Sequence, residues 1–111
     1  MAEDLMLLEK PGWLEKFKAQ VHKDFELAGV LQYLPFLETR TLEELQQSFY
    51  RSVMALETGN SLKNLLYRID LTEKQIAAAA REQPGKPLQL VLAELMIKRI
   101  LQKVVLKERY K

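Results

Sequence analysis

The last stretch of the chain, residues 87–110, is the feature that most constrains the fold. It opens at Pro87, and a proline is tolerated in the first turn of a helix because the N–H groups there have no intrahelical partner. From Leu88 onward no glycine or proline interrupts a run of good helix formers. At about 1.5 Å per residue such a helix is roughly 36 Å long, enough to cross a small domain. The sequence therefore predicts a long C-terminal helix.

The apolar residues of this helix follow helical spacing and fall into two stripes. Only two polar residues occur between Leu88 and Ile97, so the first turns are expected to be buried on several sides. Farther along, the apolar surface is wider than one neighbouring helix needs. Either the domain wraps both sides of this helix, or part of the helix forms a protein interface, for which we expect a symmetric homodimer through the distal half. The predicted interface residues are Ile97, Leu101, Val104 and Val105. The charge-free run is too short to span a membrane, so no membrane partner is expected.

Upstream signals predict further helices with short connections. Thr41 and Thr72 each begin a capping box, and Gly29 is a natural helix end. Pro11-Gly12 is expected to break the chain before a helix over residues 13–28. Residues 30–38 are expected to form an apolar connector, and the alanine run at 77–80 allows the last helix to approach closely.

These signals predict an all-α fold, a compact single-domain bundle of five to six helices packed around the long C-terminal helix. At 111 residues the chain is long enough to bury a core, and we expect one domain over residues 1–111. Within it, residues 1–11 form a short N-terminal helix or arm, and residues 98–111 form a basic end of the last helix. The amino terminus carries acids where a signal peptide needs bases, which predicts a cytoplasmic protein.

The charge is unevenly distributed along the chain. Residues 1–45 carry nine acids against five bases, a net charge of −4, whereas residues 46–111 carry twelve bases against six acids, a net charge of +6. Such a charge asymmetry suits nucleic-acid binding. Alternatively, the opposite charges attract each other between the two halves of one fold or of a dimer. The residues placed to contact phosphates are Lys98, Arg99, Lys103 and Lys107. The competing interpretation is that bases at a helix C-terminus favour its dipole and keep that end soluble.

No catalytic, cofactor or metal site is expected. The chain has no cysteine and one histidine, His22, which lies two residues from Asp24 and so points to another side of a helix. The glycines are scattered at helix ends rather than gathered in a phosphate-binding loop. Arg68 and Asp70, in a turn between two predicted helices, form a candidate clamp for a partner or a small anion; the alternative is that they pair internally and fix the corner.

The segments LLYRIDLTEKQIAAA and AELMIKRILQKV resemble small, uncharacterised cytosolic helical proteins of bacteria. The resemblance implies a bacterial, cytoplasmic protein and carries no activity with it. Our leading hypothesis is a non-enzymatic helical protein–protein interaction module that forms a homodimer. The alternative is a nucleic-acid-associated regulator that binds through the basic C-terminal helix.

Overall fold

The computed structural model describes residues 5–56 and 60–110, which form an all-α structure. No strand occurs in this described part of the chain. The predicted all-α bundle with a long C-terminal helix is confirmed. In chain order the elements are the 3-10 turn η1 (Met6–Glu9), α2 (Pro11–Leu27), the 3-10 turn η2 (Leu31–Tyr33), α3 (Leu42–Leu56), α4 (Ser61–Ile69), α5 (Glu73–Glu82) and α6 (Leu88–Arg109).

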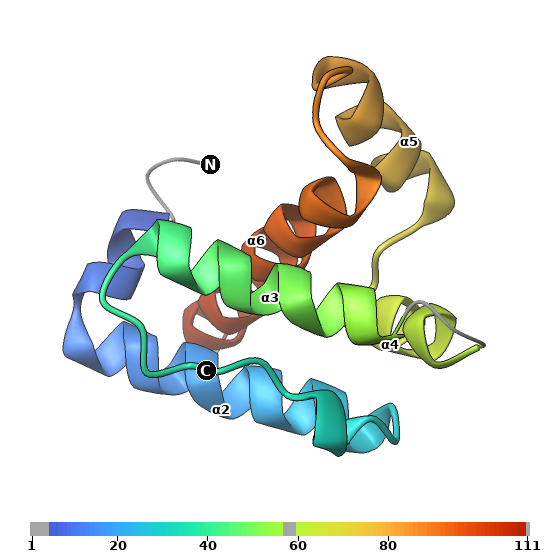
Figure 1. Cartoon of the computed structure of the whole chain (residues 1–111). Coiled ribbons are helices and arrows are strands. Elements are labelled where there is room, and N and C mark those ends of the chain that lie inside the picture. Colours follow the sequence, from blue (N-terminus) through green and yellow to red (C-terminus); the bar gives the residue numbers. More distant parts are fainter. Residues whose placement is uncertain (1–4, 57–59, 111) are drawn as a thin grey trace.

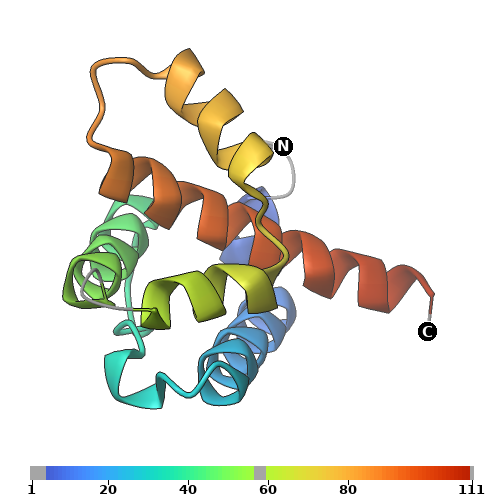
Figure 2. The same ribbon diagram turned by 90° about the vertical axis from the view of Figure 1, so that its right-hand side faces the viewer.

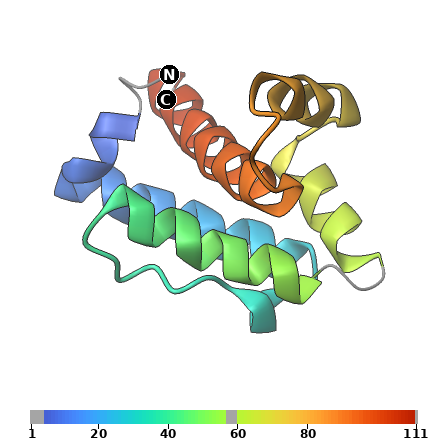
Figure 3. The ribbon, with the colours of Figure 1, turned by 45° about the horizontal axis from the view of Figure 1, so that its top comes forward.

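The helices are arranged around α6, which crosses two of them. α2 and α3 run alongside each other (Figure 1), and they are seen end-on in Figure 2 with α6 lying across both. α4 closes one end of the pair, and α5 stands against the first half of α6, outside the rest of the bundle (Figure 3). The distal end of α6 projects beyond the other helices (Figure 2).

The core is built from the inward faces of α2, α3, α4 and α6. The rings of Phe17 and Phe49 are tilted against each other with centroids 6.3 Å apart, which joins α2 to α3. From α6, the fully covered side chains include Met96, Ile100 and Leu101. α5 contributes no buried residue, although the partner of its alanine-rich segment is α6, as the sequence predicts.

The interface predicted on α6 is wrong, because its four residues face the interior of this same chain. Ile97, Leu101, Val104 and Val105 are exposed by only 1%, 0%, 4% and 8%. The apolar face is wide because more than one helix covers α6, with α3, α2, α5 and α4 all in contact with it. Burial also extends beyond the first turns of α6, since buried positions continue to Val105, while Leu88 in the first turn is half exposed.

Most helix boundaries follow the local signals. The Thr72 hydroxyl accepts from the Gln75 N–H and the Gln75 side chain accepts from the Thr72 N–H, which confirms that capping box. Gly29 follows α2 with φ +75°, a conformation that glycine adopts without strain. The break expected at Pro11-Gly12 is wrong, because Pro11 begins α2.

The Thr41 capping box is only partly reciprocal. The Glu44 N–H donates to the Thr41 hydroxyl, as expected, but the Glu44 carboxylate accepts from the N–H of Arg40. The end predicted for this helix at Gly59 lies outside the described residues.

The connector over residues 30–38 packs on the core, as predicted. Val30 is buried, Tyr33 and Leu34 are half-buried, and the Ser48 hydroxyl donates to the Phe36 carbonyl at 2.6 Å. Among the described helices, none has the length and apolar character needed to cross a membrane.

Candidate functional site

A polar cleft of about 350 Å³ lies where α2, the corner after α4 and α6 meet. It brings together residues that are far apart in the sequence, including Arg68 and Asp70 of the turn and two bases of the predicted nucleic-acid contact. The lining residues are Gln20, Lys23, Asp24, Tyr67, Arg68, Asp70, Lys103 and Lys107. Four of them are basic and two are acidic, so the cleft is electropositive.

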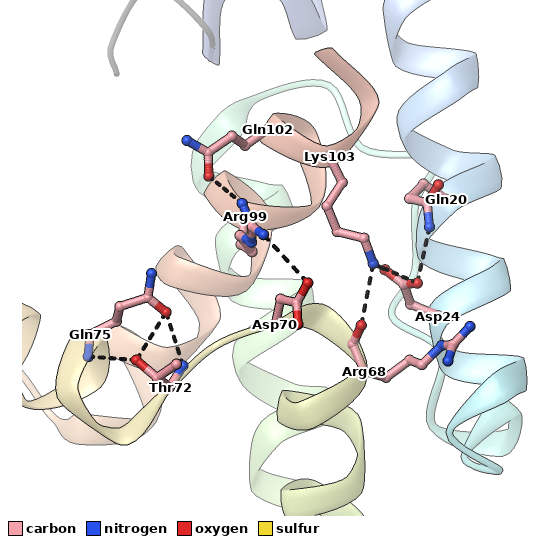
Figure 4. Close-up of polar contacts among 9 residues, drawn as sticks. All are labelled: Gln20, Asp24, Arg68, Asp70, Thr72, Gln75, Arg99, Gln102 and Lys103. Carbon is pink, nitrogen blue, oxygen red and sulfur yellow. Dashed lines mark hydrogen bonds and ion pairs between the residues drawn. The ribbon is translucent and has the colours of Figure 1, made fainter. Parts of the chain in front are cut away.

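The floor of the cleft is built on Asp24, a buried carboxylate on α2. The Nζ of Lys103 lies 3.0 Å from both Asp24 oxygens, and the Gln20 side-chain amide donates to Oδ1 at 3.0 Å (Figure 4). Gln20 in turn accepts from the Nζ of Lys107 at 2.6 Å. A carboxylate removed from water needs such charged and polar partners, and here α6 supplies the cation, Lys103, while α2 supplies the amide of Gln20.

Lys103 also donates to the backbone carbonyl of Arg68 at 3.3 Å, so its three acceptors match the three hydrogens of an ammonium group. The C-terminal end of α4 is thereby tied to both α2 and α6. Lys103 is a structural cation, with no remaining N–H for a ligand.

Asp70 and Arg68 do not pair with each other, although such an internal pair was the alternative to a clamp that binds a partner or an anion. Asp70 ends α4 in the left-handed conformation, φ 69°, and its carboxylate lies 3.5 Å from Arg99 of α6. Arg99 also donates to Gln102 at 2.7 Å. Figure 4 shows the Arg68 side chain extending toward α2, away from Asp70. The corner is therefore fixed by Asp70 and by the Arg68 carbonyl, and the Arg68 guanidinium stays on the cleft wall.

The basic stripe predicted to contact nucleic acid is largely engaged within the chain. Arg99, Lys103 and Lys107 meet Asp70, Asp24 and Gln20 respectively, and Lys98 is half-buried. The ion pairs of Arg99 and Lys103 reduce the positive charge that is available to a phosphate backbone, whereas Lys107 contacts a neutral amide and keeps its charge.

Sequence reasoning missed Gln20, Lys23 and Tyr67, and it considered Asp24 only in relation to His22. One signal was available in the sequence. Gln20 and Asp24 are four residues apart and flank the apolar positions of α2, and a polar side chain that is buried there needs a hydrogen-bond partner. The identity of those partners, 79 and 87 residues away, was not readable from local spacing.

A second surface is an apolar groove of about 680 Å³ between η1 and the start of α3. Five of its ten lining residues are leucines, and its exposed edges are Met6, with 62% of its surface accessible, and Leu42, with 38%. An adjoining hollow shares Thr39 and Thr41 with the groove and includes Phe36, another exposed apolar side chain. We refer to the groove between η1 and α3 as the η1 groove.

Neither the histidine His22 nor the buried serine Ser48 lines the polar cleft. His22 is exposed on α2, and Ser48 is buried with its hydroxyl donating to a backbone carbonyl. Within residues 5–56 and 60–110, no cluster of three or more His, Asp or Glu side chains is placed to hold a metal ion.

Comparison with known proteins finds no family model, no curated protein and no solved structure that matches this chain. The function is therefore argued from the surfaces of the fold.

Proposed function

We propose that this chain is a non-enzymatic helical protein–protein interaction module, and that it associates with a second copy of itself through the η1 groove. The observation that carries the proposal is the groove itself, a concave and mainly apolar surface with Met6 and Leu42 exposed along its edge. Exposed apolar surface gathered around a concavity is typical of protein interfaces. The interface that we propose lies on η1 and α3 instead of the buried face of α6.

The segment of the second copy that fits the groove is the distal end of α6. This end projects from the bundle (Figure 2), and its side chains Leu106 and Tyr110 are exposed by 40% and 84%. An amphipathic helix end laid into an apolar groove is a recurrent mode of recognition.

Charge favours the same pairing. The groove is lined by one acid, Glu9, and one base, Arg40, and the adjoining hollow is lined by two acids, Glu43 and Glu44, and one base, Arg51, so the two together carry a net charge of −1. The end of α6 carries Arg109, an exposed base. Opposite charges at the rim of an interface set orientation and association rate more than affinity.

The η1 groove and the distal end of α6 also lie next to one another in one copy, which suits a dimer with two-fold symmetry. Four residues of the η1 region line the groove, while Leu7 lines a hollow with Trp13, Val105 and Arg109 at the end of α6. A second copy can therefore insert its α6 end and receive the first in return, which closes the pair.

Light scattering coupled to gel filtration tests the proposal on the whole chain. The wild type is expected at twice its 12.9 kDa chain mass, and Leu42→Glu or Leu106→Glu is expected to reduce it to 12.9 kDa. Both positions are accessible, so circular dichroism should show the same helix content for both variants. Met54→Glu, an exposed position of α3 outside the groove, is the matched control and should stay dimeric.

Mixing the two variants sharpens the test. Leu106→Glu retains an intact groove and Leu42→Glu retains an intact α6 end, so a mixture should recover about half of the contacts and form a weak heterodimer. A wild type that stays at 12.9 kDa at millimolar concentration contradicts self-association. The bacterial origin and the cytoplasmic location expected from the sequence remain predictions.

A further inference from the structure

We propose that the cleft between α2, α4 and α6 is a binding site for a phosphate-type oxyanion. Its contacts are Lys23, Arg68, Lys107 and the Tyr67 hydroxyl, above a floor made by Asp24 and Lys103. The site is separate from the η1 groove and shares no lining residue with it, so the inference does not depend on the proposed dimer.

The charges of the cleft leave a surplus that an anion would neutralise. Its lining has four bases and two acids. One base, Lys103, is matched by Asp24 at 3.0 Å, and Asp70 is matched from outside the cleft by Arg99 at 3.5 Å. Three cationic side chains therefore remain without an acid: Lys23, Arg68 and Lys107.

Asp24, the carboxylate closest to the floor, would not repel the ligand strongly. Both of its oxygens are bonded to Lys103, and Oδ1 also accepts from Gln20. Its negative charge is therefore compensated within the floor, and the field at the cleft mouth is set by the three other cations.

The available donors suit an oxyanion with several acceptors. The Arg68 guanidinium has no hydrogen-bond or ion-pair partner among the described residues, and its planar fork matches two oxygens of one phosphate. Lys107 uses one N–H on Gln20 and keeps two, while Lys23 and Tyr67 are exposed at the rim. Three cations favour a dianion over a single carboxylate, and a phosphate monoester carries about −1.5 to −2 charges at pH 7.

The dimensions and the exposed ring of Tyr67 favour an organic phosphate over the bare ion. The cleft volume of about 350 Å³ is at the lower end of the usual range for small-molecule sites. The Tyr67 ring, 85% accessible, offers a flat apolar surface at the rim. The phosphate monoester could belong to a free small molecule or to a phosphorylated side chain, and both would use the same donors.

Isothermal titration calorimetry of the whole chain at low ionic strength tests the site. The probes are inorganic phosphate, a nucleoside monophosphate and a phosphoserine peptide. We expect saturable one-to-one binding of at least one probe, weakened roughly a hundredfold by the double variant Lys23→Gln/Arg68→Gln, because each of the two charge-assisted hydrogen bonds is worth about one power of ten.

A matched control removes two positive charges outside the cleft. Lys63→Gln/Lys74→Gln alters exposed bases of α4 and α5 that do not line the cleft, and it should bind as the wild type does. Equal losses of affinity in both double variants would mean that the probes bind through non-specific electrostatic attraction, and this result would overturn the proposed site. Binding that survives Lys23→Gln/Arg68→Gln, or no binding of any probe, would overturn it as well. Tyr67→Ala should weaken the nucleoside monophosphate more than inorganic phosphate.

Discussion

Lys103 of α6 places its Nζ 3.0 Å from both carboxylate oxygens of Asp24 on α2, across 79 residues of sequence. This contact explains two features at once. It accounts for a buried acid on the apolar face of α2, and it engages one base of the C-terminal helix in a contact within the chain. The same ammonium reaches the Arg68 carbonyl, so the pair also positions the corner that forms one wall of the oxyanion cleft.

The two members of this pair should respond unequally to substitution. Lys103→Met leaves a carboxylate that is 2% exposed without its cation, whereas Asp24→Asn leaves a lysine that is 18% exposed and able to reach water. Lys103→Met is therefore expected to cost about 3–5 kcal/mol of unfolding free energy, and Asp24→Asn clearly less. Urea unfolding followed by circular dichroism measures both; an equal or reversed order would contradict the assignment of Asp24 as the buried partner.

The long helix should be most sensitive in its middle and least at its first turn. Leu101 is fully covered and Leu88 is half exposed, although both are leucines on apolar stripes of α6. Leu101→Ala is expected to cost about 2–5 kcal/mol, because it leaves a cavity. Leu88→Ala, its matched control, should cost less than about 1 kcal/mol. Similar losses at both positions would show that the N-terminal turn of α6 is packed as tightly as its centre.

Two glycines should change stability in opposite directions when replaced by alanine. Gly29 has φ +75°, so a Cβ there is strained, and Gly29→Ala is expected to destabilise by about 1 kcal/mol. Gly12 lies in the first turn of α2 with open space around it, and Gly12→Ala should stabilise by about 0.5–1 kcal/mol. Thermal unfolding of the two variants measures the difference, and shifts of the same sign would contradict the conformation assigned to Gly29.

One ion pair gives a pH dependence. The hydrogen bond from Lys18 to Glu38, 3.0 Å long, raises the pKa of Lys18 above its ordinary value of 10.5. Because the folded pKa is the higher one, the pair's contribution is fully present below pH 10.5 and is lost as the pH rises through the raised pKa. Glu38→Gln should cost less than about 1 kcal/mol near neutral pH, since Glu38 is largely exposed.

Unfolding of this variant and the wild type at a series of pH values checks the sign. The two stabilities should converge at strongly alkaline pH, above the raised pKa of Lys18. A difference that grows with alkalinity would mean that the Lys18 ammonium is not stabilised by Glu38.

Local chemistry in the sequence determined the elements. Thr72 with Gln75, Gly29 and Pro87 mark helix boundaries through hydrogen bonds and dihedral angles that involve near neighbours, and these boundaries are present in the structure. Helical periodicity also identified which residues of the last helix share a face. These features need only the chain within a few residues of each position, which is why the all-α fold with a long C-terminal helix could be predicted.

Tertiary structure alone decided what covers each face. Leu101 and Val104 have the spacing of a partner surface, yet other helices of the same chain cover them, because periodicity specifies a direction and not the neighbour in that direction. Lys103 and Lys107 have the spacing of a basic patch, yet they meet Asp24 and Gln20 of a distant helix. The oxyanion cleft could not be predicted in full for the same reason: its charge balance depends on contacts that form only when α2, α4 and α6 pack together.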